Sequence, residues 1–276
     1  MGERTVALAI RHAAAQLAEF SDTARLDAEL LMAEALGVTR SDMLLRHSGN
    51  RVPPSFAQLV ARRAAHEPVA YILGHQDFYG RSFIVTSDVL IPRGDSESVV
   101  DTALEFMPER GRILDCGTGS GALLLTLLAQ RPAAEGAGID KSLGALAVAV
   151  ANAARLGVQD RAQILHLDWH EAGWSAGLGQ FDLIIANPPY VETGADIPPS
   201  VRSFEPEVAL FAGADGLDDY RVLIPQLNDL LAENGTAIVE IGSTQVNSVS
   251  GLARQAGFAV TLRHDLALRP RALVLQ

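Results

Sequence analysis

Two short segments carry residue types that could bind a small ligand and hold a reacting group. The first reads Gly117-Thr118-Gly119-Ser120-Gly121; it follows the apolar run 113–116 directly and precedes an apolar helical stretch. Glycines let the backbone turn tightly and approach a ligand closely, and a helix start presents unpaired N–H groups. The second reads Asn187-Pro188-Pro189-Tyr190 and ends the apolar run 181–186. We therefore expect a nucleotide-like cofactor at the first segment and a rigid polar corner at the second.

The residues around the glycines indicate which cofactor binds there. Dinucleotide-binding folds use a similar turn, but with the spacing Gly-x-Gly-x-x-Gly, whereas this chain has Gly-x-Gly-x-Gly. Asp115 stands just before the glycines. A carboxylate there is unfavourable beside a pyrophosphate and favourable beside the cationic amino and sulfonium groups of S-adenosylmethionine. The pattern favours S-adenosylmethionine.

Three further side chains stand where successive apolar runs end. Asp140 ends the run 137–140, where it could accept hydrogen bonds from both ribose hydroxyls. Asp168 and Trp169 end the next run and offer an acceptor for the adenine amino group and an aromatic face for its ring. Each alone is also explained as a turn residue after a strand. Because they follow successive strands on one ligand-binding edge, the three together favour a cofactor site.

The Asn187 corner suggests methylation of a planar nitrogen. Proline has no N–H and a fixed φ, so two prolines stiffen the chain and leave their carbonyls without neighbouring backbone donors. An NH₂ group can donate one hydrogen to the Asn187 side-chain oxygen and the other to the Pro188 carbonyl, while Tyr190 stacks on the planar group. Two fixed acceptors raise the electron density on the nitrogen and aim it at a methyl carbon, and no general base is strictly required. The alternative, an ordinary proline turn, is disfavoured by the glycine loop.

The first part of the chain has the pattern of a small helical domain. Helical spacing and capping residues predict helices at 3–20, at 22–37 with Gly37 as its stop, after the N-cap Thr39, and after Pro53-Pro54. Nothing in this part offers catalytic chemistry. We interpret residues 1–74 as a helical domain that packs or recognises a partner.

Strand-like patterns begin near residue 77. The runs 82–86 and 89–91 predict a hairpin, and we expect residues 75–97 to link the two domains. In residues 98–276, helical stretches alternate with the apolar runs 112–116, 137–140, 162–168, 181–187, 236–242, 258–264 and 272–275. This alternation predicts an α/β fold with a doubly wound, Rossmann-like sheet that binds ligands beyond the carboxyl ends of its strands.

Composition limits the remaining possibilities. The 276 residues are 48% hydrophobic, which suffices for one sizeable α/β core and a smaller domain. No apolar stretch has the length of a membrane span and no secretion signal is present, so we expect a cytoplasmic protein without membrane contact. Cys116, the one cysteine, is interpreted as a buried apolar residue, and His166 and His170 as structural residues rather than metal ligands.

Charge is distributed unevenly along the chain. Residues 1–74 hold eight Arg and eight Asp or Glu, so the net charge of −11 falls on residues 75–276, which also contain Lys141, the one lysine. An acidic catalytic domain without a basic run is poorly suited to a phosphate backbone. We therefore expect no nucleic-acid partner.

Together with the two core motifs, further segments make the chain resemble the PrmC/HemK family, enzymes that methylate the side-chain amide of the glutamine in the Gly-Gly-Gln motif of bacterial peptide chain release factors. The resemblance covers nearly the whole chain in order. The further segments are residues 68–74, 78–80, 90–93, 204–206, 215–217 and 240–242 with Gln245.

The resemblance implies roles for particular residues. Gly117 to Gly121, Asp140, Trp169 and Asn187 would bind S-adenosylmethionine, and Asn187 to Tyr190, including Pro189, would hold the glutamine. The helical domain would dock a class 1 release factor. The implied reaction transfers a methyl group to glutamine N5, leaves S-adenosylhomocysteine and supports translation termination. We expect a monomer.

The chain departs from the family pattern at two places. Where the family usually has Pro-Arg-Pro-x-Thr-Glu, this chain reads Pro92-Arg93-Gly94-Asp95-Ser96-Glu97. The loss of a rigid proline is expected to loosen the junction between the hairpin and the next helix. Where the family tends to have Gly-x-Asp-Arg, the chain reads Leu268-Arg269-Pro270-Arg271. Neither departure touches the Asn187 corner.

Two other functions use the same motifs. An adenine-N6 DNA methyltransferase could hold a flipped adenine in the same corner, although it needs a DNA-binding surface. A binding protein of this fold could have lost the reaction, although the glycine loop and the corner are intact.

Overall fold

The computed structural model describes residues 5–276, which form two compact units. The helical unit contains the residues up to His75 together with Ile197–Phe204, and the sheet unit contains Gln76–Asp196 and Glu205–Gln276. No helix within the described residues is long and apolar enough to cross a membrane.

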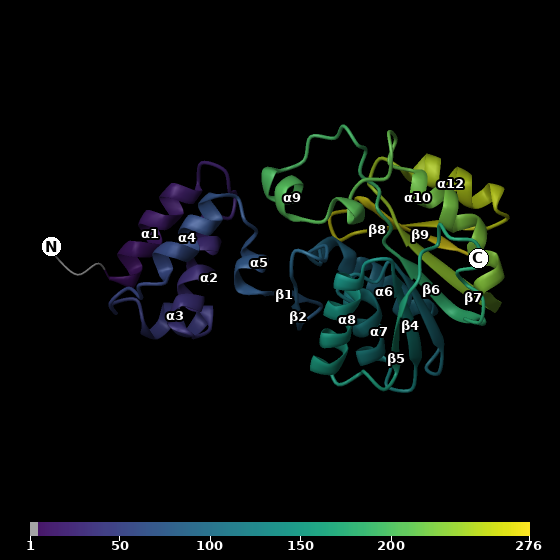
Figure 1. The fold of residues 1–276 in the computed structure, drawn as a ribbon, viewed down its shortest axis with the longest axis horizontal. Helices are drawn as coiled ribbons and strands as arrows, with labels where there is room; N and C mark the ends of the chain where they lie inside the picture. The colour runs from purple at the N-terminus through teal and green to yellow at the C-terminus, as the bar shows by residue number, and fades with distance from the viewer. Residues whose placement is uncertain (1–4) are drawn as a thin grey trace. The chain divides into compact units, whose positions relative to one another are not determined.

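The helical unit is built from short helices whose ends are marked by capping residues. The predicted Thr39 cap is confirmed, since its hydroxyl accepts a hydrogen bond from the Asp42 N–H at 3.1 Å. Gly37 ends the preceding helix with a φ of 67°, which glycine adopts without strain. Residues 3 and 4 of the first predicted helix lie outside the described residues. The helices are α1 (Val6–Leu17), α2 (Ala24–Leu36), α3 (Arg40–Arg46), α4 (Phe56–Ala64), α5 (Val69–Leu73) and α9 (Pro199–Phe204) (Figure 1).

A seven-stranded sheet forms the centre of the sheet unit and confirms the predicted fold class. Its strand order is β5-β4-β3-β6-β7-β9-β8, with parallel pairing from β5 to β7 and antiparallel pairing on both sides of β9. The chain order therefore reverses between β3 and β6, where doubly wound sheets bind ligands. The strands are β3 (Arg112–Cys116), β4 (Glu135–Asp140), β5 (Ala162–His166), β6 (Phe181–Ala186), β7 (Leu231–Glu240), β8 (Val260–His264) and β9 (Pro270–Leu275).

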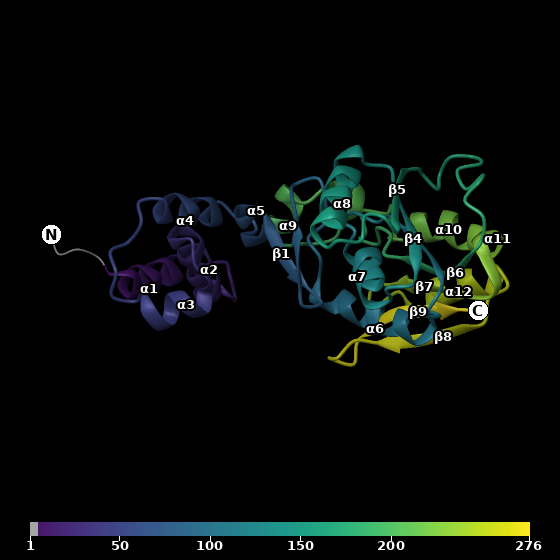
Figure 2. The ribbon, with the colours of Figure 1, turned by 90° about the horizontal axis from the view of Figure 1, so that it is seen from below.

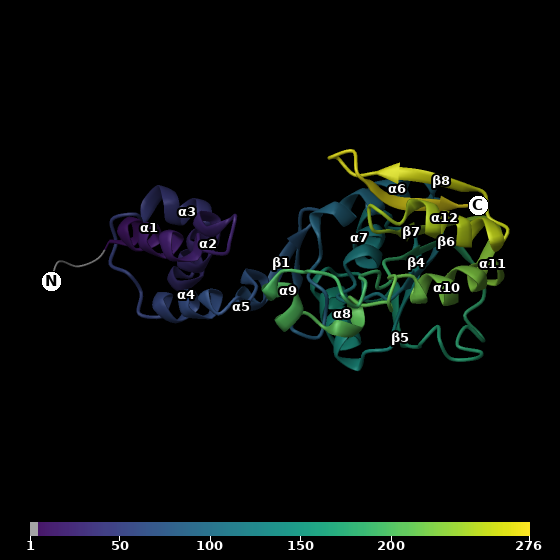
Figure 3. The ribbon, with the colours of Figure 1, turned by 90° about the horizontal axis from the view of Figure 1, so that it is seen from above.

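Alternate residues of the central strands enter two cores, one on each face of the sheet. In β6, Leu183 and Ile185 join the core that includes α6 and α7, while Ile184 and Ala186 join the core that includes α10 and α12. Figures 2 and 3 show the helices on the two sides of the strands. The helices of this unit are α6 (Glu97–Phe106), α7 (Ala122–Gln130), α8 (Leu143–Arg155), α10 (Asp218–Leu223), α11 (Leu227–Leu230) and α12 (Val246–Gln255), with 3₁₀ turns η1 (Gly94–Ser96), η2 (Glu207–Ala209) and η3 (Ile224–Gln226).

The hairpin forms from different segments than predicted. Its strands are β1 (His75–Phe78) and β2 (Arg81–Ile84), and residues 89–91 belong to no strand. The turn between the strands is Tyr79-Gly80, with positive φ values of 50° and 70°. Such a turn twists with the strands, but its usual signal is Asn-Gly or Asp-Gly, so the sequence pattern does not mark this turn and the predicted pairing is wrong.

Candidate active site

A cavity lies at the carboxyl ends of the parallel strands and collects most of the predicted site residues. Gly121, Pro188 and Tyr190 do not line it. The predicted residues that do are Gly117, Thr118, Gly119, Ser120, Asp140, Asp168, Trp169, Asn187 and Pro189, together with Asp115.

Strand register brings the two core motifs together. Cys116, the last residue of β3, pairs with Ala186, the last residue of β6. The next residues along the two strands are Gly117 and Asn187, so the glycine loop and the corner leave the sheet side by side. A cofactor on the loop and a group held by the corner are therefore neighbours.

Internal hydrogen bonds hold the glycine loop in shape. Gly117, Gly119 and Gly121 have φ values of 79°, 54° and 81°. The N–H groups of Gly117 and Thr118 both donate to the Ile139 carbonyl at 2.9 Å. A Cβ on Gly117 would lie 3.2 Å from the Trp169 ring, so the absence of a side chain lets that ring approach the loop. The loop is preorganised for a ligand before the ligand arrives.

Asp115 places a buried carboxyl group in the cavity wall. One oxygen accepts a hydrogen bond from the Thr118 hydroxyl at 2.8 Å, while Oδ1 is buried and makes no hydrogen bond with the described residues. Burial raises the pKa of Asp115 to about 7, and the Thr118 hydroxyl and the Leu124 backbone N–H lower it only in part. A cationic ligand would satisfy the unpaired oxygen and favour the ionised form.

The Asp140 carboxylate ties the glycine loop to the start of α8. Oδ2 accepts a hydrogen bond from the Gly119 N–H and Oδ1 one from the Ser142 N–H, both at 2.9 Å. A carboxylate has about four acceptor sites, so these two bonds leave acceptor capacity for the predicted ribose contact. Its role in holding the loop was not predicted, because no sequence pattern links Asp140 to Gly119.

Asp168 and Trp169 are both held by neighbouring polar groups. Asp168 Oδ1 accepts hydrogen bonds from the His170 backbone and from its ring, both at 2.9 Å. Burial alone would raise the pKa of Asp168, but the bonds from His170 outweigh it and lower this pKa. The Trp169 indole N–H donates to Asp219 at 3.1 Å. His170 thus fixes the predicted adenine-binding carboxylate, and His166 contacts the Lys141 carbonyl at 3.0 Å.

The Asn187 corner keeps its acceptors free. Within the described residues, the Asn187 side chain and the Pro188 carbonyl take part in no hydrogen bond. Asn187 is half-buried and lines the cavity, while Pro188 and Pro189 are buried. The corner thus has two unsatisfied acceptors on a backbone that cannot bend easily.

Gln245 holds the backbone of the corner in place through the Tyr190 carbonyl. The Gln245 side-chain amide donates to the Tyr190 carbonyl at 3.0 Å and to the Gly216 carbonyl at 3.1 Å, and accepts from the Gly242 N–H at 3.1 Å. Burial, followed by the nearby Glu240 carboxyl, raises the pKa of Tyr190 to about 12. Tyr190 is therefore a neutral phenol at physiological pH. Gln245 was named only as part of a family segment, and its role was missed.

The sequence did not predict the part of the cavity wall that residues 88–93 and 206–209 form. Buried Glu205 accepts a hydrogen bond from the Ile91 N–H at 3.1 Å and pairs with Arg93. It joins residues 88–93 to residues 206–209, and members of both segments line the cavity. These residues lie more than 100 positions apart, so no local spacing could have revealed the contact.

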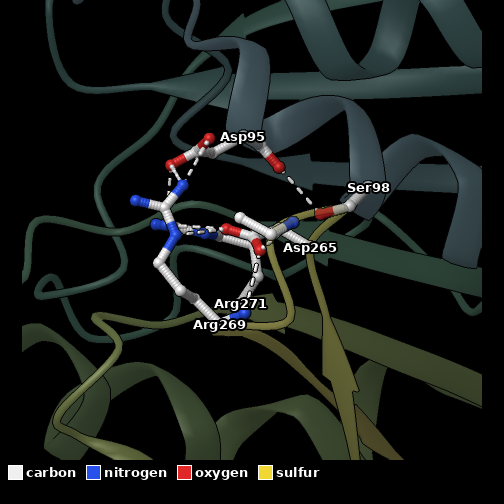
Figure 4. Close-up of polar contacts among 6 residues, drawn as sticks. Asp95, Ser98, Asp265, Arg269 and Arg271 are labelled. Atoms are coloured by element: carbon white, nitrogen blue, oxygen red, sulfur yellow. Dashed lines mark hydrogen bonds and ion pairs between the residues drawn. The ribbon is translucent and has the colours of Figure 1, made fainter.

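The two departures from the family pattern meet in space. Asp95 lies in η1 and pairs with Arg269 at 3.1 Å and with Arg271 at 2.8 Å (Figure 4). Asp265, buried at the end of β8, pairs with Arg269 at 3.0 Å and with Arg271 at 3.5 Å. The four charged side chains tie the β8–β9 turn to the wall segment that carries Arg93 and the cavity-lining Ser96.

Comparison with known proteins identifies the family. The PrmC N-terminal domain family matches residues 9–74, and the methyltransferase small domain family matches residues 96–204. A methyltransferase from Pyrococcus furiosus has a similar fold, with a TM-score of 0.53 and 16% identity over 80% of this chain and 98% of that one. The fold, the glycine loop and the corner define a Rossmann-like methyltransferase that depends on S-adenosylmethionine.

Relatives specify the family within this class. The release factor glutamine methyltransferase of Rhodospirillum rubrum is 42% identical over 91% of this chain and 78% of its own length. That of Caulobacter vibrioides is 42% identical over 92% of this chain and 89% of its own length. The chain belongs to the release factor glutamine methyltransferase family. Its methyl donor is S-adenosylmethionine, which becomes S-adenosylhomocysteine.

The cavity fits this donor. The buried, unpaired Asp115 oxygen suits a cationic group, and the Gly117 backbone leaves room for close approach beside Trp169. We infer that Gly117, Thr118, Gly119, Ser120 and Gly121 form its cradle, with Asp140, Asp168, Trp169 and Asn187 around it.

Proposed function

We propose that the chain methylates the side-chain amide nitrogen, N5, of the glutamine in the Gly-Gly-Gln motif of class 1 peptide chain release factors. The observation that supports this most is the pair of unsatisfied acceptors, the Asn187 side chain and the Pro188 carbonyl, on a rigid corner beside the glycine loop. An amide NH₂ group has two hydrogens to donate, and the corner offers two acceptors.

The chain's own residues would work chiefly by alignment. The bound cofactor supplies an electrophilic methyl group. Asn187 and Pro188 accept the two amide hydrogens and so orient the nitrogen lone pair, while Tyr190 packs against the planar group. Asp115 balances the positive charge at the glycine loop. Positioning of this kind is worth up to roughly 7–11 kcal/mol in well-oriented reactions. The methylated nitrogen is acidic and loses its proton readily.

The domain roles follow from this substrate. Residues 98–276 would carry catalysis, residues 75–97 would link the domains, and residues 1–74 would recognise the release factor. We propose a protein rather than duplex DNA as the substrate, because residues 75–276 carry the whole net charge of −11. A single chain lines the cavity, so a monomer would suffice. Release factors act in translation, which places the proposed activity in the cytoplasm.

A lysate experiment tests the substrate directly. Purified protein and labelled S-adenosylmethionine are added to a bacterial lysate lacking its endogenous release factor methyltransferase, and modified peptides are identified by mass spectrometry. We expect a methylated Gly-Gly-Gln peptide. Label in duplex DNA without label in a release factor would support the DNA alternative, and cofactor binding without any transfer would support a silent binding protein.

A further inference from the structure

The turn between β8 and β9, residues 265–269, carries the two most exposed large apolar side chains of the sheet unit. Leu266 is 101% exposed and Leu268 is 82% exposed. The charged residues of the turn point elsewhere: Asp265 is buried, and Arg269 pairs with Asp265 and Asp95 (Figure 4). The turn therefore offers solvent two apolar side chains beside Arg269, which is 53% exposed but ion-paired, in a unit whose net charge is strongly negative.

Topology places this turn at the same edge of the sheet as the cavity. β9 runs antiparallel to β7, with Ala272 opposite Glu240 at the carboxyl end of β7. Val239, one residue earlier, pairs with Ala186, which precedes the Asn187 corner. Figures 2 and 3 show the turn projecting from the end of the two yellow strands. The Asp95 ion pairs connect it to the cavity wall one residue from Ser96.

Hydrogen bonds fix the conformation of the turn. Asp265 Oδ1 accepts from the N–H groups of Ala267 and Arg269 at 2.9 Å. The Leu268 N–H donates to the Asp265 carbonyl at 2.9 Å, and the Asp265 N–H donates to the Arg269 carbonyl at 2.9 Å. An exposed turn that is already ordered loses little conformational entropy when it binds a partner.

Leu268 is held in an unfavourable backbone conformation. Its φ is 60°, in the left-handed region, where a side chain is strained and glycine is not. The leucine side chain gains almost no burial in return, since it is 82% exposed. Because burial of the leucine side chain does not offset this backbone strain, we infer that Leu268 serves to contact another molecule.

We propose that Leu266 and Leu268 form a docking contact for an apolar patch on the protein substrate, beside its methyl-accepting glutamine. The inference rests on the proposed function, because a protein must bring the surface around its glutamine against this edge of the sheet. The contact would add affinity for the intact release factor without changing the chemistry at Asn187.

Leu268→Gly should improve the stability of the chain and weaken its binding of the release factor. Removing the strained side chain should raise the melting temperature, while removing the apolar contact should raise KM for the intact release factor. With Leu266→Ser added, we expect KM to rise about tenfold, while kcat at saturating substrate and the dissociation constant of S-adenosylmethionine stay unchanged. A purely structural role for Leu268 cannot produce higher stability together with weaker substrate binding.

Val150→Ser provides a matched control, because Val150 is an exposed apolar residue of α8 that does not line the cavity. An unchanged KM in the double leucine variant would overturn the docking contact and leave the proposed function intact.

If the wild-type chain transfers no methyl group to a release factor, the proposed function fails, and calorimetric binding of the release factor to wild type and variant still tests the contact. A wild-type dimer that the leucine substitutions dissociate would assign the turn to self-association and overturn the proposal.

Discussion

The glycine loop and the Asn187 corner leave the sheet side by side, yet they are stabilised in opposite ways. The loop satisfies its own polar groups: Gly119 and Ser142 donate to Asp140, and Thr118 donates to Asp115. The corner makes no such bonds at Asn187, and its backbone is held by two prolines and by the hydrogen bond from Gln245 to the Tyr190 carbonyl. In the proposed mechanism the loop would bind a cofactor that must be released after every turnover, whereas the corner would need free acceptors only while the amide is aligned.

This contrast separates effects on folding from effects on catalysis. A substitution in the loop removes bonds that hold the chain together, so it changes stability as well as ligand binding. A substitution of the Asn187 side chain removes no hydrogen bond that holds the folded chain within the described residues.

Asn187→Ala should have the largest effect and tests the corner alone. Removal of one of two acceptors should lower kcat at least 100-fold, comparable to the loss of one preorganised hydrogen-bonding group in other enzymes. The melting temperature should stay within about 1 °C of wild type, because the side chain makes no hydrogen bond within the described residues. Transfer of labelled methyl and thermal unfolding provide the two measurements. Unchanged kinetics would disprove the alignment mechanism.

Asp140→Ala should change binding and stability together. The substitution leaves the N–H groups of Gly119 and Ser142 without their acceptor, and each such bond contributes about 1 kcal/mol. We expect the dissociation constant of S-adenosylmethionine to rise about tenfold or more and the melting temperature to fall. Asp140→Asn, which keeps one acceptor oxygen, should lie between wild type and Asp140→Ala. Weaker binding of S-adenosylmethionine without any fall in the melting temperature would contradict the proposed role of Asp140 in holding the loop.

Asp115 should make cofactor binding depend on pH. Burial raises its pKa to about 7, so the carboxyl is mainly neutral at pH 5.5 and ionises as the pH approaches 7. The ionised form attracts the cationic cofactor, so calorimetric titrations should show affinity increasing several-fold over this range. The same profile should be flat in Asp115→Asn.

The stability contribution of Asp115 has the opposite dependence on pH. The folded chain retains a proton that the unfolded chain releases above about pH 4. The contribution is therefore fully present below pH 4 and is lost as the pH rises towards 7. Denaturant titrations of wild type and Asp115→Asn at several pH values would measure it.

Gly94→Pro should have the smallest effect and lies outside both motifs. Arg93 is extended, with φ of −97° and ψ of 139°, as a residue before proline should be. A Cβ on Gly94 would meet nothing within 4 Å. We expect a gain of about 0.4–1 kcal/mol in unfolding free energy from the stiffer unfolded chain, seen as a slightly higher melting temperature. Gly94→Ala should give a smaller increase, and a lower melting temperature for Gly94→Pro would show that the junction does not accept proline.

Much of the fold was predictable because its signals are local. The alternation of apolar runs with helical stretches predicted the doubly wound sheet, and Thr39 and Gly37 marked helix ends correctly. The hairpin was assigned wrongly because Tyr79-Gly80 lacks the usual turn residues. Residues 89–91 resemble a strand because they are apolar, but Val89 and Ile91 are buried at the cavity wall instead.

Only the part of the candidate site that directly follows the strands was predictable from the sequence. Residues that follow strands could be placed because parallel strands end at one edge, which is how Asp140, Trp169 and Asn187 were found. The wall held by Glu205 and the ion pairs of Asp95 depend on contacts between distant segments, which spacing does not encode. Family resemblance named several of these segments but gave no reason for them, and the hydrogen bonds supply that reason.

Cys116 gives the protein a built-in reporter of its own motions. It is the one thiol in 276 residues, and it lies fully buried in β3, next to the glycine loop. Burial raises the pKa of this thiol well above its ordinary value, so the folded chain offers almost no thiolate to an alkylating reagent. The rate at which Cys116 is alkylated therefore measures how often the centre of the sheet opens. If bound cofactor slows this rate, the decrease measures how much the cofactor stabilises the sheet against opening.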